Sequence, residues 1–309
     1  MALMSGGGDP VAIDELADRI DHAWKTWQAS RHRYSGLLPT LPILIRDTEA
    51  TLRSLRRGHQ RRQIATVASD LYGLLRTVTR RVDRTDLSFL VADRGLRSAE
   101  DADDPIRLAV ARWNLGHTLL MAGEHEAAIE LTTLAADSVI AEGGPTPAAI
   151  AMTGALQLVA AVAEARAGRL WEARDRLSTV HPIAVRSQQA GNVGHTMFSP
   201  LNVELHAMAI ELQAGDAIEA LRIADQLDVT ECPSVERRFT FALDLARAYE
   251  LRREETGTLL HLLDAERVAP EDLDHCPAAQ EMVRRLLHSA RSTNRTQAAA
   301  LADRLNMDT

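Results

Sequence analysis

The sequence predicts an all-α fold, a right-handed α-solenoid in which pairs of helices stack one after another. Long segments rich in Ala, Leu, Arg and Glu repeat their apolar positions with a period of about 3.6 residues, which is typical of amphipathic helices. Runs of alternating β-branched residues, the pattern of strands, are almost absent. Glycines recur between helical segments at 123, 168 and 215, which indicates that one helix–turn–helix unit repeats along the chain.

Composition narrows the classes of function. The net charge of −8 argues against broad electrostatic binding of DNA by this chain. Cys232 and Cys276 form neither a CxxC motif nor a disulfide framework, so we expect a reduced, cytoplasmic setting. No apolar run approaches the roughly 18 residues of a membrane span, and no membrane contact is expected. The sequence has no phosphate loop, dinucleotide fingerprint or nucleophile elbow, so we expect neither an enzyme nor a cofactor.

Basic residues are clustered in two places, "RSLRRGHQRRQ" at 53–63 and "RTVTRRVDR" at 76–84. A nucleic-acid patch and a solvated helix face next to a turn both explain such clusters. Aromatic residues do not interleave with them as single-strand binding requires, which favours the solvated face.

The chain is expected to have three parts. Residues 1–10, "MALMSGGGDP", lack the basic and apolar regions of a signal peptide and are interpreted as a flexible leader or a cloning remnant. Residues 11–100 are expected to form helices that lead into the solenoid, and residues 101–309 the solenoid with its C-terminal capping helices. The helices of the first part are expected, in order, at 9–33, 43–57, 60–80 and 87–100.

The first of these helices has a clear amphipathic pattern. Asp9-Pro10 is a favourable start, and one apolar stripe follows at helical spacing. The stripe consists of Ile13, Leu16, Ile20, Ala23, Trp24 and Trp27. We expect its two tryptophans to be core residues rather than ligand contacts. The two prolines of "SGLLPTLPIL" at 35–44 predict a bent approach to the next helix.

The stretch "WNLGHTLLMAGEHEAAIEL" at 113–131 decides between a metal site and a helical hairpin. A zinc helix of the HExxH type needs a second His where Ile129 stands, so a metal site is not expected. A hairpin needs a small residue where helices approach and a glycine where the first helix ends. Leu115-Gly116, Gly123, Ala128 and Ala135 have the order and spacing of the tetratricopeptide repeat. His117 and His125 are then expected on different helices, as surface or groove residues.

Four such hairpins are expected. Each has a first helix A and a second helix B, and the fourth carries Arg253 in place of the turn glycine. The expected A and B helices are 106–122 and 125–140, 148–167 and 170–180, 200–214 and 216–228, and 234–253 and 255–267, followed by a capping pair within 278–306. Leu273 to Leu305 is the expected dimer contact.

The A helices of a tetratricopeptide stack line its concave face, where a peptide or small polar ligand can bind. Equivalent positions at Gly116, Ala161, Met208 and Ala246 set the register. The expected ligand contacts are Trp113, Asn114, His117, Met121, Phe198, Asn202, His206, Asp244 and Arg247. The alternative is that each polar member cross-links neighbouring helices. The loop "GNVGHTMFSP" at 191–200 is either a lid that carries His195, Met197 and Phe198 or a plain turn.

Segments across the chain resemble a known family. They include "TWQASRHRYSGLLPTLPILIRDTEA" at 26–50 and "DLSFLVADRGLRSAEDADDPIRLAVARWNLGHTLL" at 86–120, together with 200–225 and 237–277. They are similar to the C-terminal region of actinobacterial transcription regulators of the lambda-repressor (XRE) type, which join an N-terminal helix-turn-helix to a tetratricopeptide-like sensor. The resemblance covers the chain from about residue 11 onward and implies a sensor that binds a peptide or small molecule and forms a homodimer.

The chain departs from this family at its N-terminus. No helix-turn-helix or recognition helix can be placed in 1–34, so DNA contact is expected only through a domain absent from this sequence. Either the domain was removed or this is a natural relative without it. Two functions therefore remain open: the ligand-sensing and dimerising region of a regulator, and a stand-alone tetratricopeptide adaptor that binds a partner protein.

Overall fold

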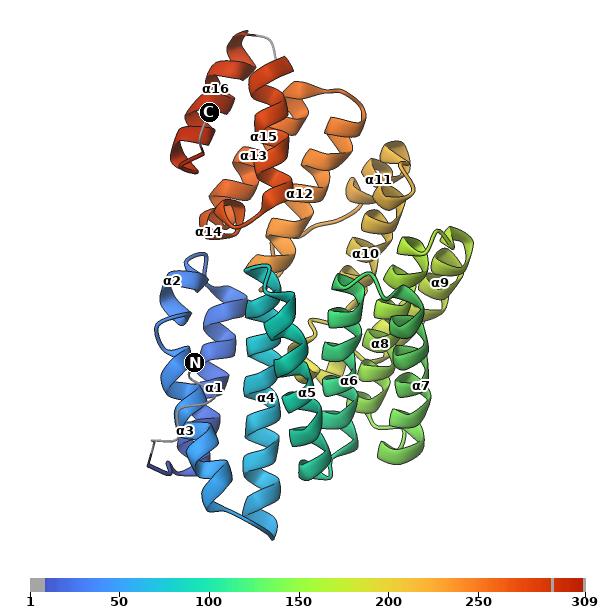
Figure 1. Ribbon diagram of the computed structural model, residues 1–309. Helices are drawn as coiled ribbons and strands as arrows, with labels where there is room; N and C mark the ends of the chain where they lie inside the picture. Colours follow the sequence, from blue (N-terminus) through green and yellow to red (C-terminus); the bar gives the residue numbers. More distant parts are fainter. Residues whose placement is uncertain (1–8, 290–291, 308–309) are drawn as a thin grey trace. The chain divides into compact units, whose positions relative to one another are not determined.

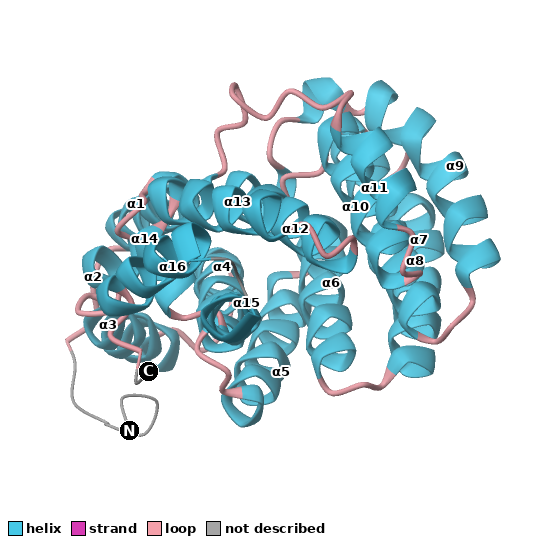
Figure 2. Ribbon diagram, turned by 90° about the horizontal axis from the view of Figure 1, so that it is seen from above, coloured by secondary structure: helices cyan, strands magenta, loops and turns pink. Residues whose placement is uncertain are grey.

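In the computed structural model, residues 9–289 and 292–307 are described, and their regular structure is entirely helical. They form sixteen α-helices and two short 3-10 turns and contain no strand, which confirms the all-α class (Figure 2). The expected leader, 1–10, lies outside the described residues except for its last two.

Short connections join most of the helices, which are labelled in Figure 1. In chain order they are α1 (Ile13–Ala29), α2 (Arg33–Leu37), α3 (Leu41–Ser54), α4 (His59–Arg81), α5 (Thr85–Ala102), α6 (Pro105–Met121), α7 (His125–Gly143), α8 (Pro147–Arg166), α9 (Leu170–Arg186), α10 (Pro200–Gln213), α11 (Ala217–Ala224), α12 (Val235–Leu251), α13 (Glu255–Val268), α14 (Pro270–Asp274), α15 (Pro277–Ser289) and α16 (Ser292–Arg304).

The helices belong to two compact units. Unit 1 contains the chain up to Trp27 and Ser35–Val203, whereas unit 2 contains Gln28–Tyr34 and Glu204–Thr309. The boundary at Val203 lies in the first turn of α10. Residue 100, where the sequence-based division was placed, lies within α5 of unit 1.

Five helix connections share one turn geometry. The second residue after the first helix has a positive φ, and the next N–H donates to the carbonyl five residues earlier, which is the Schellman arrangement. The residues with positive φ are Asp83, Gly123, Gly168, Gly215 and Arg253. The corresponding hydrogen bonds, each 2.9 or 3.0 Å long, run from Arg84 to Thr79, Glu124 to Leu119, Arg169 to Glu164, Asp216 to Glu211 and Glu254 to Tyr249. The three expected turn glycines and their arginine substitute thus form one structure.

The same geometry identifies a hairpin that the sequence did not reveal. Asp83 has a φ of 54° between α4 and α5, so these two helices form a pair like those that follow. Aspartate tolerates this left-handed backbone better than most residues, because its short side chain hydrogen-bonds locally. Glycine alone is therefore too narrow a signal for this turn.

Several helix boundaries differ from the predictions. The first helix begins at Ile13 rather than Asp9, because the Val11 N–H donates to Thr51 Oγ1 of α3 at 3.0 Å. It ends at Ala29, where the Ser30 hydroxyl accepts a hydrogen bond from the His32 N–H and competes with the helix. α11 ends at Ala224 instead of 228.

The end of α9 differs as well: this helix continues through Pro182 to Arg186, six residues beyond its predicted end. Leu177, Val180 and Ala184 are all buried on one face. Burial of this stripe keeps the helical path through a proline that removes one backbone hydrogen bond.

Within unit 1 the first helices of the hairpins pack against one another. α4 contacts α6, and α6 contacts α8, whereas the second helices α5, α7 and α9 contact mainly the first helices beside them (Figure 1). We call α4, α6 and α8 the A-helix row. Gly116 of α6 makes one of these approaches possible, since a Cβ there would lie 2.5 Å from Thr132 Cγ2 and 3.3 Å from Val159 Cγ1. Ala128 and Ala135 of α7 are buried, as the repeat pattern predicts.

Among the described residues, one helix is long and apolar enough by composition to cross a membrane. It is α8, and 72% of its apolar window is buried inside the protein. The sequence was expected to contain no apolar run of about 18 residues. This helix escaped that criterion because Thr, Gly and Gln interrupt its apolar residues. Its position in the A-helix row accounts for its composition.

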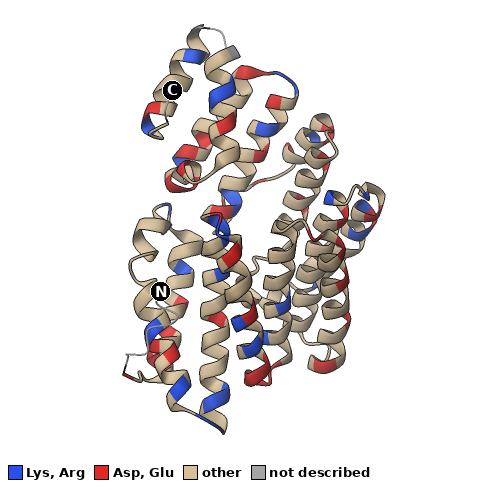
Figure 3. Cartoon of the chain, viewed as in Figure 1, with Lys and Arg blue, Asp and Glu red and all other residues tan. Residues whose placement is uncertain are grey.

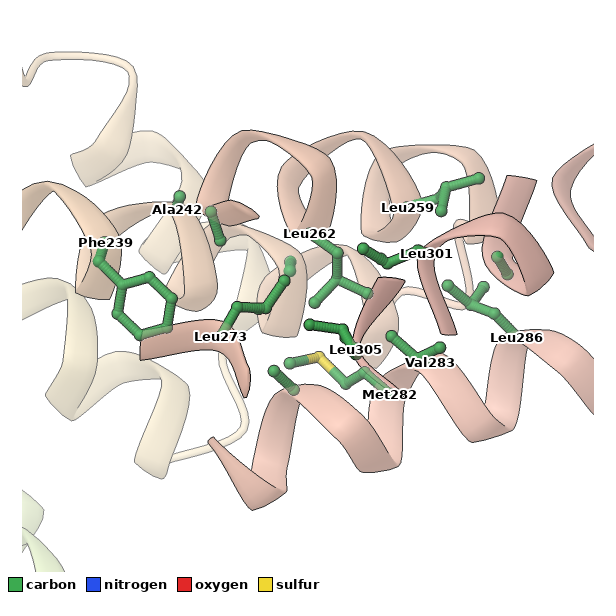
Figure 4. Packing of buried hydrophobic residues seen from close by; sticks show 14 of the residues in the cluster. Phe239, Ala242, Leu259, Leu262, Leu273, Met282, Val283, Leu286, Leu301 and Leu305 are labelled. Carbon is green, nitrogen blue, oxygen red and sulfur yellow. The ribbon is translucent and has the colours of Figure 1, made fainter. Parts of the chain in front are cut away.

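The apolar side chains of the C-terminal helices build the core of unit 2 (Figure 4). α12, α13, α15 and α16 supply most of them, and Phe239 and Leu262 are fully or almost fully buried. Leu273 and Leu305, the ends of the expected dimer contact, belong to this core and are 0% and 6% exposed. The apolar pattern of 273–305 therefore reflects packing within the chain.

A short N-terminal segment completes unit 2. Arg33, 0% exposed, forms an ion pair with buried Asp272, and the Tyr34 N–H donates to Glu271 Oε2 at 2.8 Å. The Tyr34 ring stacks on His275, with the ring centres 4.5 Å apart. Removing either partner of a buried ion pair leaves an uncompensated charge, so this segment is held firmly to α14.

The shared turn predicts opposite effects of glycine at two positions. Arg253→Gly is expected to raise the free energy of unfolding by about 0.5–1 kcal/mol, because it removes left-handed strain from a residue with a Cβ. Gly168→Ala is expected to lower it by about 1 kcal/mol, because Gly168 has a φ of 81°. Urea unfolding of both variants tests this, and a less stable Arg253→Gly protein would contradict it.

Candidate functional site

The nine predicted ligand contacts fall into two sets. Six lie in unit 1: Trp113, Asn114, His117, Met121, Phe198 and Asn202. Three lie in unit 2: His206, Asp244 and Arg247.

Three of the unit 1 residues meet on α6 beside a buried arginine of α4. Arg76 is 1% exposed, and its Nε donates to Asn114 Oδ1 at 2.7 Å. The Arg76 guanidinium lies over the Trp113 ring, 5.1 Å from the ring centre. The His117 ring meets Trp113 edge-on, with the ring centres 4.4 Å apart. His117 is therefore the half-buried, outer residue of this group, whereas Arg76, Trp113 and Asn114 are buried.

Asn114 has a structural role in this stack. Its Oδ1 accepts two hydrogen bonds from Arg76, and its Nδ2 donates to the Val110 carbonyl at 3.1 Å. It therefore links α4 to α6, as the alternative reading of the polar groove residues predicted.

Trp24 of α1 extends the stack. Its Nε1 donates to the Asp70 carbonyl at 3.0 Å, and the residue is 4% exposed, which confirms its expected place in the core. Gly73 of α4 lies between Trp24 and Asn114: a Cβ there would be 3.1 Å from Asn114 Nδ2 and 3.6 Å from Trp24 Cζ2. We call Trp24, Arg76, Trp113, Asn114 and His117 the aromatic layer. It draws on α1, α4 and α6.

The loop before α10 packs onto the same part of unit 1. The His195 ring stacks on Trp24, with the ring centres 4.1 Å apart and the planes 7° from parallel. A Cβ on Gly194 would overlap Val110 of α6, and a Cβ on Gly154 of α8 would overlap the Phe198 ring. Phe198 is 8% exposed, so this predicted ligand contact lies against the protein's own helices.

The loop backbone is strained where these contacts form. Gly194, His195 and Met197 have φ values of 56°, 59° and 56°. For residues with a Cβ this region costs about 1–2 kcal/mol each, so tertiary contacts must hold the loop in place. One of them is the hydrogen bond from the Met197 N–H to Asn192 Oδ1, at 2.8 Å.

Charged groups surround the stacked His195. Burial, and after it Arg107, lower the pKa of His195 to about 4, while Asp21 opposes the shift. Arg107 forms an ion pair with Asp70, whose pKa burial raises to about 6 against the effect of Arg107. His195 is therefore neutral near pH 7, and Arg107 disfavours a second positive charge here.

Met121 and Asn202 are the remaining unit 1 predictions. Met121 is the last residue of α6 and is half-buried. Asn202 is 4% exposed near the start of α10, and its N–H donates to Ser199 Oγ at 3.2 Å.

In unit 2, Asp244 and Arg247 are three residues apart on α12 and share a face. Burial raises the pKa of Asp244 to about 7, and exposed Arg247 partly opposes this. His206 is half-buried on α10. Asp244 is thus a carboxyl group that titrates near neutral pH.

The sequence did not reveal a pocket of about 420 Å³ among α1, α2 and α3 of unit 1. Ala23, Leu37 and Leu44 form apolar parts of its lining, and Asp18 and His22 are exposed polar members. The prolines of "LLPTLP" were the available signal, because they bend the chain between α2 and α3.

The two basic clusters differ in structure. Arginines gather at the ends of α3 and α4 that the 55–58 turn connects (Figure 3). There Arg53 pairs with Glu49 at 3.5 Å and Arg61 with Asp101. The second cluster is not a continuous surface, since Arg76 is buried and Arg84 pairs with Asp86 at 2.7 Å. Both arrangements are consistent with helix faces and turns.

Among the described residues, no group of three His, Cys, Asp or Glu side chains is placed to hold a metal ion. His117 and His125 lie on α6 and α7, as expected. No protein-family model matches this chain, and the search of curated proteins finds no match either.

The Arg76–Asn114 bond predicts strong energetic coupling. Asn114→Leu is expected to destabilise the protein by about 2–4 kcal/mol, because buried Arg76 loses the Asn114 oxygen as a hydrogen-bond acceptor. Adding Arg76→Met to that variant is expected to restore part of the loss. Urea unfolding of both single variants and the double variant measures the coupling. Purely additive effects would contradict the proposed link.

Asp244 predicts a pH dependence of stability. The pKa of Asp244 is higher in the folded protein, at about 7, than in the unfolded chain, at about 4. Protonated Asp244 therefore contributes to the free energy of unfolding in full below about pH 4, and this contribution is lost as the pH rises through about 7. Asp244→Asn is expected to reduce the loss of unfolding free energy between pH 5 and pH 8. Asp225→Asn, at an exposed position, is the control. Equal pH profiles for wild type and Asp244→Asn would refute the assignment.

Proposed function

We propose that this chain is the ligand-sensing and dimerising region of a cytoplasmic bacterial transcription regulator. The effector, a peptide or small molecule, binds along the A-helix row. The observation that carries the proposal is the aromatic layer. Only 4% of the residues are aromatic, yet two of the four tryptophans lie there beside a buried arginine and a half-exposed histidine. Aromatic walls with a few fixed polar groups are typical of ligand sites.

The packing supports a tetratricopeptide-like, right-handed solenoid as the scaffold. A row of hairpins whose first helices touch while their second helices diverge is curved toward the first helices. The recurring Schellman turn gives successive hairpins the same internal geometry. Trp113 and His117 lie on α6, in the middle of that row, where a bound peptide would contact several repeats.

A sensor of this kind acts by shifting a conformational equilibrium. An effector that binds one curvature of the row more tightly than another shifts the population toward it. In a dimer, that change repositions the DNA-binding heads that the family resemblance implies, and this coupling between sites is allosteric. DNA contact then depends on those heads, and the chain itself serves as sensor.

A stand-alone adaptor is the second candidate, and one surface favours it. Trp171 of α9 is 73% exposed beside a hollow of about 280 Å³ that also includes Glu172 and Asp175. Exposed tryptophans often anchor protein–protein contacts. The acidic neighbours suit a basic segment of a partner.

Native mass spectrometry of the purified chain tests the sensor proposal. A dimer that carries a defined extra mass is the expected result, and the mass identifies the class of the ligand. A bare monomer would contradict sensing and favour the adaptor.

His117→Ala is expected to reduce the ligand-bound fraction at least tenfold without changing the unfolding midpoint by more than a few degrees. The reason is that His117 contacts the layer from its half-buried edge and is not part of the deep core. His59→Ala, at an exposed position on α4, is the matched control. Full ligand occupancy in the His117→Ala protein would show that the aromatic layer is not part of the binding site.

A further inference from the structure

The loop that contains residues 191–199 covers three specific positions on unit 1. His195 lies flat on Trp24 of α1, Gly194 lies against Val110 of α6, and the Phe198 ring lies over Gly154 of α8. We call Trp24, Val110 and Gly154 the loop site. Three helices contribute to it, and two of them belong to the A-helix row.

The fit is specific at both rings. Gly154 leaves no room for even one methyl group beneath the Phe198 ring, so the absence of a side chain there shapes the place where the ring lies. The His195 and Trp24 rings are nearly parallel, and their centres are only 4.1 Å apart, so the two rings are in direct stacking contact. His195 and Phe198 are three residues apart in the loop, and each occupies its own place on the helices.

The loop backbone itself does not favour this arrangement. His195 and Met197 both have positive φ, although neither is a glycine. A segment held by side-chain contacts against its backbone preference is one that a better-suited ligand can displace. The loop site is then a ligand site that the chain itself occupies.

We propose that the loop is a displaceable internal occupant and that the loop site binds an external peptide presenting two flat, uncharged rings three residues apart. This inference rests on the proposed sensing function and names its ligand class. The peptide binds Trp24, Val110 and Gly154 in place of His195 and Phe198, and the released loop is the conformational signal.

The charges around the loop site favour a neutral ring. Arg107 of α6 faces His195 and pairs with Asp70 of α4, while Asp21 lies on α1. Asp104, at the start of α6, lies near Asp70. With Arg107 beside the stacked ring, a cationic side chain meets repulsion, whereas Phe, Tyr or neutral His does not. The preferred peptide therefore has aromatic or neutral imidazole rings.

The test adds the loop to the protein as a separate peptide. The probe is a fluorescently labelled decapeptide, GNVGHTMFSP, which has the sequence of residues 191–200. The protein is the full chain with His195→Ala and Phe198→Ala, which empties both ring positions. Fluorescence anisotropy is expected to show at least tenfold tighter binding to this variant than to wild type, because the intact loop competes in wild type.

Two controls isolate the rings. A decapeptide with Ala at both ring positions is expected to lose at least tenfold in affinity. Gln189→Ala, at an exposed position just before the loop, leaves both rings and the loop backbone unchanged. This variant is expected to bind the probe as weakly as wild type. Equal probe binding by the double variant and wild type would overturn the proposal.

A second measurement uses the wild-type protein and so does not depend on the folding of the double variant. In wild type, a saturating concentration of the probe is expected to increase amide hydrogen exchange in 188–199 by at least tenfold, because bound peptide releases the loop. Unchanged exchange at saturation would overturn the proposal. A bare monomer in native mass spectrometry, combined with tight probe binding by the double variant, would refute the sensing function and leave the loop site intact.

Discussion

The space that mid-helix glycines leave for neighbouring side chains is the constraint on which unit 1 depends. Each member of the A-helix row has one: Gly73 in α4, Gly116 in α6 and Gly154 in α8. A glycine inside a helix costs roughly 1 kcal/mol relative to alanine, so its presence needs a packing reason. At each position the missing Cβ makes room for a neighbour: Trp24 and Asn114, Thr132 and Val159, or the Phe198 ring.

This constraint connects the fold to the candidate function. Gly73 brings α1, α4 and α6 together, and the aromatic layer forms where they meet. Gly154 shapes the position of Phe198 in the loop site. The positions that allow the helices to pack closely are therefore also the positions where rings can lie, so the scaffold and the proposed binding surface arise from the same packing.

Unit 2 depends on a different kind of contact. Its core is mostly aliphatic, and the charged pair Arg33–Asp272 is fully or almost fully buried. Such a pair adds little net stability over an apolar alternative, but it specifies one partner for the segment 28–34. Half-buried Asp244, whose raised pKa of about 7 lies near neutral pH, makes unit 2 a pH-sensitive part of the proposed sensor.

The sequence by itself determined the helical class, the hairpin turns and most helix positions. These depend on local chemistry: apolar residues at helical spacing, and glycine where φ is positive. Asp83 and Pro182 show the limit, since each departs from the usual residue preference, and tertiary packing decided the outcome.

The sequence also identified Trp113 and His117 as neighbours, because one helix turn separates them. Only the tertiary structure showed that Asn114 bonds to Arg76, that His195 stacks on Trp24 and that Phe198 lies on Gly154. The partners in these contacts are separated by 38 residues or more, and nothing in the local pattern specifies which distant side chain each will meet. That choice depends on how the helices pack, which is a property of the whole unit.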